Sequence, residues 1–474
     1  MMTIPKQEII PGASRLIQSL RDVGYDFPTA IADVVDNSIS AGATRINIDI
    51  HFLEEQSYVR IVDNGIGMAR ENLIEALRFG SEKEYDNNDN LGKFGLGLKT
   101  ASISQCRKLT IASKFGGCSS LNSYCWDIDH VIRTNSWEVI APDEQTFGMH
   151  INGKIQGDSG TIVIWQNLDR VINLSENVDL ISSNRLLTLC HETEEYLSLV
   201  FHRFLEGKVG ERKLSIFING NEIEPWDPYC LQEENTIRLP EQPVPILIHG
   251  EQSYFYIKPY VLPTKEKFSS QNAWKKAAGI NDWNSQQGFY IYRANRLIQN
   301  GGWNRLRTKD EHTKYARIAM DFSTELDEEF KINISKMQVS LPKQSRDLLK
   351  VAILPVINKA KEVYKSKPQS IFQIPKLRTH EPNNDRVPPR LRPFDSTITT
   401  PTIDTSEGFK NINNGNAEKN QTTPFFSGHN ENEVESKLWR LDEIERALNS
   451  MTTNSEEARL LNDLFIRLRS SIGI

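Results

Sequence analysis

Residues 32–43, ADVVDNSISAGA, combine two carboxylates and an amide with small and apolar side chains in one predicted helix. Asp33, Asp36 and Asn37 stand at positions i, i+3 and i+4, so they lie on one face of that helix. The apolar neighbours indicate a helix that packs into a core, where a carboxylate without a partner costs on the order of several kcal/mol. The segment therefore predicts either a solvated charged face or a face that binds a cation. Asn37 offers an amide oxygen to Mg²⁺, and a carboxylate beside it can orient a water.

Composition limits the classes of protein that this chain can form. With 474 residues and 38% hydrophobic side chains, the sequence can form two or three packed domains. The net charge of −6 means that any contact with nucleic acid depends on a local basic surface. Five cysteines without a C-x-x-C pair argue against a zinc module and a disulfide framework, and they predict a reduced, cytoplasmic protein. The N-terminus lacks a signal-peptide pattern, and no stretch reaches the roughly 20 apolar residues that span a bilayer.

Hydrophobic periodicity divides the chain into four regions. Helical segments and β-branched strands predict a first α/β domain at residues 1–170 and a second at residues 171–366, which includes an Asn-Gly hairpin in SIFINGNEIEPW. Residues 367–432 are rich in Pro, Asn, Thr and Ser, so we expect a flexible linker. Apolar side chains recur at spacings of three and four in residues 433–470, which predicts a helical hairpin or dimerisation helices.

The motif VDNGIGM, residues 62–68, follows a predicted strand. Asp63 can accept a hydrogen bond from an exocyclic amine, while Gly65 and Gly67 allow the backbone to approach a flat ligand. An ordinary Asn-Gly turn is the alternative interpretation. The motif therefore indicates a candidate site for a planar base but does not establish one.

A second glycine motif, LGKFGLGLKTAS, places Gly92, Gly95 and Gly97 before a predicted helix. Backbone N–H groups at a helix N-terminus bind phosphate well. Lys99 in the first turn opposes the helix dipole, which favours an anion bound beside it. The motif is not a P-loop, because Gly97 and Lys99 are not adjacent, and no strand directly precedes it as in a Rossmann fingerprint.

Together, these motifs resemble the GHKL ATPase superfamily, which includes gyrase B, the ninety-kilodalton heat-shock chaperone, sensor histidine kinases and MutL. The resemblance covers about residues 12–170 and includes a late Gly-Thr pair, Gly160-Thr161. It implies an α+β chain with a Bergerat-type α/β sandwich that binds ATP and Mg²⁺, in which Asn37 holds the metal and residues 81–97 form an ATP lid. The cofactor-binding residues that it implies are Asn37, Asp63, Gly65, Gly67, Gly92, Gly95, Gly97, Lys99 and Thr161.

The second domain resembles the transducer domain of the same superfamily, which sends one lysine to the γ-phosphate. Lys336, in KINISKMQVSLP, stands at the corresponding place between a strand and the next helix. Lys331 is the runner-up, and a solvated loop lysine is the other interpretation. The segment GFYIYRANRLIQNGGW also resembles a transducer strand and turn, and the overall likeness is greatest to bacterial MORC-like stand-alone ATP-binding proteins.

One departure from the superfamily pattern concerns the expected general base. Asp33 stands where relatives usually carry Glu, and its side chain is one methylene shorter. A catalytic group misplaced by about 1 Å can lose on the order of a hundredfold in rate. With Asp33 and Lys336 as the catalytic residues that the resemblance implies, we therefore expect slow ATP hydrolysis.

The resemblance implies a homodimer that closes on ATP and acts as a clamp or switch on DNA, in repair, restriction or antiphage defence. Partner proteins such as a nuclease or a helicase would then act with it. A stretch with nine Lys or Arg and two acids, residues 343–378, is a candidate DNA-facing surface, although a solvated helix face explains it equally well. The alternative function is a nucleotide-gated scaffold with little or no turnover that recruits partners through its tail.

Overall fold

The computed structural model describes residues 11–52, 56–80, 97–118, 120–171, 178–210, 213–248, 250–279, 282–331 and 339–366. These residues lie in one compact unit, residues 1–377, and form a seven-stranded and a six-stranded sheet. The expected linker and C-terminal helices, like Gly92, Gly95 and Lys336, lie outside the described residues. Within the described ranges, no helix has the length and apolar character needed to cross a bilayer.

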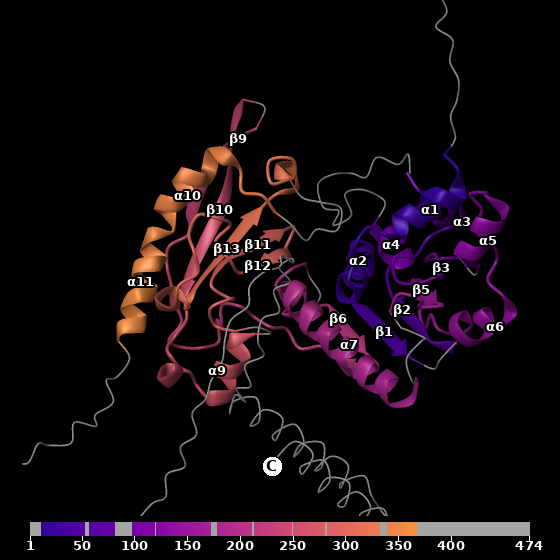
Figure 1. Cartoon of the computed structure of the whole chain (residues 1–474), viewed down its shortest axis with the longest axis horizontal. Helices are drawn as coiled ribbons and strands as arrows, with labels where there is room; N and C mark the ends of the chain where they lie inside the picture. The colour runs from indigo at the N-terminus through magenta and orange to yellow at the C-terminus, as the bar shows by residue number, and fades with distance from the viewer. Residues whose placement is uncertain are drawn as a thin grey trace, which may run out of the picture. The chain divides into compact units, whose positions relative to one another are not determined.

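The first sheet has the strand order β4-β3-β5-β2-β1-β6-β7 (Figure 1). All neighbours are antiparallel except β1 and β6, which are parallel. Alternation of β-branched and polar residues predicts β1 and β2 correctly. The strands are β1 (Arg45–His51), β2 (Tyr58–Asp63), β3 (Lys108–Lys114), β4 (Leu121–Asp127), β5 (Gly160–Gln166), β6 (Ser215–Ile218) and β7 (Asn221–Glu222).

Helices cover one face of this sheet and share its main core. Val59 and Ile61 of β2 and Trp165 of β5 pack in one cluster with helical residues such as Ile31 and Val34. The opposite face carries a smaller apolar cluster. The elements are α1 (Ala13–Arg21), α2 (Phe27–Ser40), α3 (Arg70–Leu77), α4 (Gly97–Ile103), α5 (Ile128–Thr134), α6 (Glu144–Thr146), the π-helix η2 (Phe147–Ile151), α7 (Val178–Val200) and α8 (His202–Leu205). The first domain is thus an α/β sandwich, as expected.

The first sheet extends beyond the expected domain boundary at residue 170. Strand β6 pairs in parallel with β1, and Leu197 of α7 lies in the same core as the residues of α2. The predicted Asn-Gly hairpin is present as β6 and β7, and the Asn219 side chain also bonds to both backbone groups of Ile50 in β1. Periodicity identifies a strand but not the sheet that it joins, which is why the sequence alone divided this sheet.

The second sheet has the order β12-β11-β13-β10-β8, and β9 also pairs with β10. Helices α10 and α11 share an apolar core with it, in which Leu349 and Val356 join Ile257 and Ile318. Its elements are β8 (Ile237–Arg238), β9 (Gln242–Ile248), β10 (Glu251–Val261), η3 (Lys265–Lys267), α9 (Gln271–Ala278), β11 (Gly288–Arg293), β12 (Arg296–Asn300), η4 (Glu311–Thr313), β13 (Ala316–Phe322), η5 (Thr324–Leu326), η6 (Lys343–Ser345), α10 (Arg346–Ala352) and α11 (Leu354–Lys365).

The segment that resembles a transducer strand and turn, GFYIYRANRLIQNGGW, contains a β-hairpin. Strands β11 and β12 are antiparallel, and Arg293 lies opposite Arg296. Ala294 and Asn295 form the turn with φ angles of 45° and 67°. A two-residue turn with both φ angles positive matches the twist of the flanking strands.

Candidate nucleotide-binding site

Helix α2 is buried along nearly its whole length. Asp26 accepts a hydrogen bond from the backbone N–H of Thr29, and proline stands in the first turn, so the helix has a capped and pre-organised start. Asp33 and Asp36 are each 1% exposed, which excludes the solvated charged face as an explanation. Asn37 is exposed, although its two neighbours in the chain, Asp36 and Ser38, are buried.

One partner that the two buried carboxylates share is an arginine that the sequence analysis missed. The Nε atom of Arg296 on β12 lies 2.9 and 2.8 Å from the two carboxylate oxygens of Asp36, and its Nη2 lies 3.9 Å from Asp33 Oδ1. The hydroxyl of Tyr25 donates to Asp33 Oδ2 at 2.8 Å. Burial and the neighbouring Asp33 carboxylate raise the pKa of Tyr25, so this phenol stays a donor at neutral pH. The acidic face therefore has a protein partner within the chain.

Asn37 is oriented by its own helix. Its Nδ2 donates to the backbone carbonyl of Asp33. Because the amide nitrogen is engaged, the amide oxygen is the atom with which Asn37 would ligate a metal ion. An exposed amide oxygen next to buried carboxylates suits a hard cation such as Mg²⁺ that keeps most of its waters.

Asp63 lies at the end of β2 with its two oxygens in different environments. Its Oδ1 accepts from the backbone N–H of Gly65 at 2.9 Å and of Thr161 at 3.2 Å. Its Oδ2 accepts from the hydroxyl of Ser38 on α2 at 2.8 Å. The side chain is 7% exposed, and burial raises its pKa, although these three hydrogen bonds oppose that shift. Asp63 is therefore a fixed acceptor that ties β2, β5 and α2 together.

Thr161 is held beside Asp63 by a second serine that the sequence analysis did not single out. The Ser113 hydroxyl lies 3.0 Å from Thr161 Oγ1, and it also accepts from the backbone N–H of Met68 at 2.8 Å. Ser113 lies outside the three motifs, and Ser38 lies within the first of them but was not singled out. Their role depends on strand pairing and helix packing, which one sequence does not specify.

The glycines around Asp63 allow close approaches within the protein. Gly67 has φ +68°, and a Cβ there would lie 1.9 Å from the carbonyl oxygen of Lys114. A Cβ on Gly65 would lie 2.9 Å from the Ala41 carbonyl oxygen. Between these glycines, Ile66 is 63% exposed, so an apolar side chain stands open to solvent three residues after Asp63. Such a neighbour suits a flat apolar ring whose amine reaches Asp63.

The described part of the second glycine motif begins at Gly97, the first residue of α4. A Cβ on Gly97 would lie 3.1 Å from Asp33 Oδ2, so this glycine lets α4 start close to the carboxylate. Lys99, by contrast, is 2% exposed, and its Nζ donates to the carbonyl of Ala76 at 2.8 Å. Burial lowers the pKa of Lys99 to about 8.

The position of Lys99 gives a local reason for a lysine in this helix. Ala76 lies in the last turn of α3, whose carbonyl groups lack helical partners and attract a cation. The lysine therefore stabilises the end of α3 without an anion. Contact of Lys99 with a phosphate stays a prediction, and the bond to Ala76 uses one of the three donors of its ammonium. The runner-up transducer lysine, Lys331, is exposed and has φ +48°.

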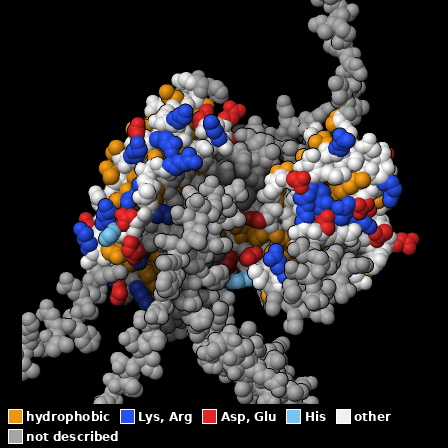
Figure 2. All heavy atoms as spheres, viewed as in Figure 1, with side chains coloured by type: hydrophobic (Ala, Val, Ile, Leu, Met, Phe, Trp, Pro, Cys, Tyr) orange, Lys and Arg blue, Asp and Glu red, His pale blue; other side chains and the backbone are white. Residues whose placement is uncertain are grey.

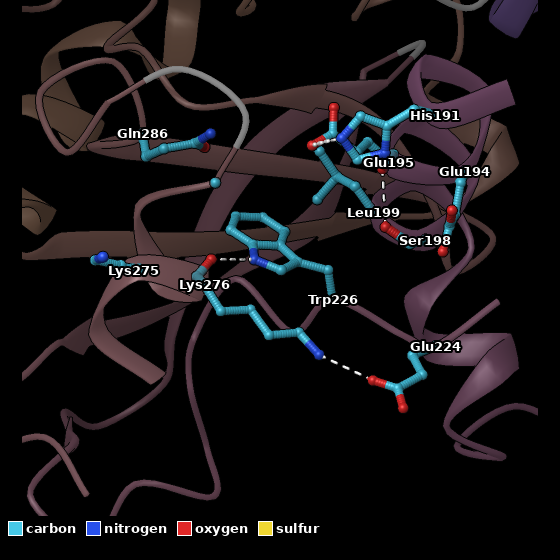
Figure 3. A pocket seen from close by; sticks show the side chains of 11 residues that line it. His191, Glu194, Glu195, Ser198, Leu199, Glu224, Trp226, Lys275, Lys276 and Gln286 are labelled. Carbon is cyan, nitrogen blue, oxygen red and sulfur yellow. Dashed lines mark hydrogen bonds and ion pairs between the residues drawn. The ribbon is translucent and has the colours of Figure 1, made fainter. Parts of the chain in front are cut away.

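A separate cavity of about 350 Å³ lies between α7, Trp226 and α9 (Figure 3). The indole of Trp226 donates to the carbonyl of Lys276, whose ammonium pairs with Glu224 at 3.1 Å. None of the expected nucleotide-binding residues lines this cavity. We assign it no ligand.

Among the described residues, His202, Glu206 and Asp227 bring one potential metal ligand each within 4.8 Å of one another. Lys208 Nζ already lies 2.7 Å from Glu206 Oε2, and the Asp227 carboxylate accepts from two backbone N–H groups. The imidazole of His202 is held by the Tyr292 hydroxyl at 2.8 Å. These contacts describe a packed polar network.

Comparisons with known proteins agree with this geometry. A family model described as histidine kinase-, DNA gyrase B- and HSP90-like ATPase matches residues 25–161. The described elements of that segment hold Asp33, Asn37, Asp63 and Thr161 in one sandwich. Residues 25–161 therefore have the fold and the motif order of the GHKL class.

Curated relatives extend this likeness. The chain is 29% identical over 177 residues to ATPase morc-1 of Caenorhabditis elegans, which is 30% of this chain and 21% of that protein. It is 24% identical over 232 residues to ATPase MORC2B of Mus musculus, covering 41% of this chain and 23% of that one. DNA mismatch repair protein MutL of Pasteurella multocida is 41% identical over 90 residues, 18% of this chain and 14% of MutL. Each match spans less than a quarter of the relative.

Proposed function

We propose that this chain binds Mg-ATP at the face formed by α2, the end of β2 and the start of β5, and hydrolyses it slowly. The observation that carries this proposal is the arrangement of Asp63: among the described residues, two backbone groups donate to its Oδ1, whereas Ser38 alone donates to its Oδ2. An oxygen of that kind can accept a second hydrogen bond from the exocyclic amine of adenine. The exposed side chain of Ile66, three residues further on, would pack against the ring.

Residues of α2 would bind the metal and orient the attacking water. Asn37 would ligate Mg²⁺, which supplies charge neutralisation to the phosphates. Asp33 would act as the base that orients water, as the resemblance implies. It is 1% exposed, and Tyr25 donates to it at 2.8 Å. A base so enclosed, on a side chain one methylene shorter than Glu, supports slow turnover.

We further propose that two copies associate when ATP is bound and act as a clamp or switch on DNA, with partner proteins. The relatives support the DNA setting, since MutL is named as a DNA mismatch repair protein. Figure 2 shows Lys and Arg side chains on the surface of the second domain. In the described part of the basic stretch, Lys350 pairs with Asp347 and Lys359 with Glu362, both at 2.8 Å. These pairs reduce the net positive charge, so any DNA contact is expected to be weak and salt-dependent.

A nucleotide-gated scaffold is the second candidate. The enclosure of Asp33 favours it, because a carboxylate held by Tyr25 and near Arg296 has limited access to water. Such a protein would bind ATP, change its association with partners and release the nucleotide with little hydrolysis.

Steady-state ATP hydrolysis by the purified chain with Mg²⁺, with and without duplex DNA, separates these functions. We expect slow turnover that Asp33→Asn abolishes, and loss of Mg²⁺-dependent binding in Asn37→Ala. Binding without turnover would support the scaffold. Absence of ATP binding would refute both functions. Stimulation by DNA would support the clamp, and its absence at low salt would count against it.

A further inference from the structure

One buried arginine joins the proposed nucleotide site to the second domain. Arg296 begins β12, and its side chain is 1% exposed. It lies 260 residues along the chain from Asp36, the carboxylate that its Nε contacts. Its Nη1 also donates to the carbonyl of Leu297 at 3.3 Å, which fixes the guanidinium plane. A shift of the β11–β12 hairpin would therefore move the guanidinium that contacts α2.

The two contacts of the guanidinium are unequal. Asp36 is held at 2.8 Å, whereas the separation of 3.9 Å between Nη2 and Asp33 Oδ1 is longer than a hydrogen bond. A displacement of the hairpin by roughly 1 Å would convert the second contact into a direct hydrogen bond or abolish it. Asp33 is the proposed base, so its position and charge environment depend on where the second domain places Arg296.

Physical chemistry makes the arginine hard to replace. Asp33 and Asp36 are like charges at i and i+3, both 1% exposed, so they repel one another unless a cation lies between them. Arginine presents a rigid planar fork of donors, whereas lysine offers a single ammonium on a flexible stem. A lysine at this place could pair with one carboxylate but could not hold both in the same geometry.

Resting on the proposed ATP reaction, we propose that Arg296 is a positioning residue for hydrolysis. It holds α2, and with it Asp33, in the arrangement that turnover needs, and it transmits the position of the second domain to the base. In this proposal it acts on the reaction through Asp33 and Asp36 and not by binding the nucleotide. Its loss is therefore expected to lower kcat while leaving ATP affinity nearly unchanged.

The test compares Arg296→Met and Arg296→Lys with the wild-type chain in ATP binding and in turnover. We expect Arg296→Met to lower kcat on the order of a hundredfold, with the Kd for ATP within about threefold of wild type. Arg296→Lys should recover part of kcat. Arg293→Met is the matched control, because Arg293 lies opposite Arg296 in the same hairpin but pairs with Asp327 inside the second domain at 2.7 and 2.9 Å.

A purely structural role for Arg296 predicts a different pattern. Breaking a buried ion pair by removing one partner is strongly destabilising, whereas replacing both partners by apolar residues is often tolerated. The double variant Arg296→Met/Asp36→Leu should therefore melt closer to wild type than Arg296→Met does, yet stay deficient in kcat. Recovery of kcat together with stability would overturn the inference, as would equal losses in Arg293→Met. Failure of the proposed function shows instead in the wild-type chain, as absent ATP binding or turnover.

Discussion

Replacement of Asp63 by asparagine tests the proposed adenine contact at the level of single atoms. Two backbone N–H groups point at the Oδ1 position, so the amide oxygen of the introduced side chain is forced there and its amide nitrogen takes the Oδ2 position. Ser38 can then accept through its hydroxyl oxygen, so the fold tolerates the change. The adenine amine, however, now faces a donor instead of an acceptor.

The size of the effect follows from these contacts. The variant loses a hydrogen bond to a charged group, about 1.5–3 kcal/mol, and buries facing donors without a partner, about 1–3 kcal/mol. A combined loss of about 3–4 kcal/mol corresponds to a 10²–10³-fold weaker Kd for ATP. Guanine presents a carbonyl oxygen at the place of the amine, so the ratio of GTP to ATP affinity should rise in the variant by at least about tenfold.

Calorimetric titration of both nucleotides into wild type and Asp63→Asn measures this change, with melting temperature as the check on folding. Asp49→Asn is the matched control, since Asp49 lies on the neighbouring strand β1 and binds Arg60 away from the site. A folded Asp63→Asn protein that binds ATP with wild-type affinity would refute the assignment of Asp63.

Three further predictions follow from named contacts. Gly67→Ala should lower the free energy of unfolding by about 1–3 kcal/mol more than Gly42→Ala, as measured by urea denaturation. Both positions have positive φ, but of the two only Gly67 would bring its added Cβ to 1.9 Å from a backbone atom, the Lys114 carbonyl oxygen. Equal losses of stability would contradict the close approach of the backbone at Gly67. Burial lowers the pKa of Lys99 to about 8, so the native state binds fewer protons than the unfolded state above that pH. Stability of wild type relative to Lys99→Met should therefore rise between about pH 8 and 10.5, by up to about 3 kcal/mol, and a pH-independent difference would contradict this. Because burial raises the pKa of Asp63, ATP affinity should begin to fall on acidification at a pH above that of an ordinary aspartate, and this acid limb should be absent in Asp63→Asn.

Local structure was largely predictable because its causes lie within a few residues. The proline in the first turn indicates the start of α2, and alternating apolar residues predict β1 and β2. The order of the motifs around Asn37 and Asp63 also predicts the class of the first domain, which the family model supports at residues 25–161.

Features that depend on distant contacts were not predictable from one sequence. Arg296 contacts Asp36 across 260 residues, and Ser38 reaches Asp63 from another element. Periodicity likewise could not reveal that β6 joins the first sheet through β1. Lys99 was interpreted from the dipole of its own helix alone. Its ammonium in fact donates to a carbonyl at the end of α3, a contact that the local sequence does not reveal.

Equilibrium binding of ATP to the wild-type chain, with Mg²⁺ and with EDTA, tests the central claim most directly. The account predicts saturable binding of one ATP per chain that weakens in EDTA and in Asn37→Ala. The helix of that variant should remain folded, because within the described ranges the exposed Asn37 side chain bonds to its own helix alone. Absence of saturable ATP binding by a folded wild-type chain would contradict the account.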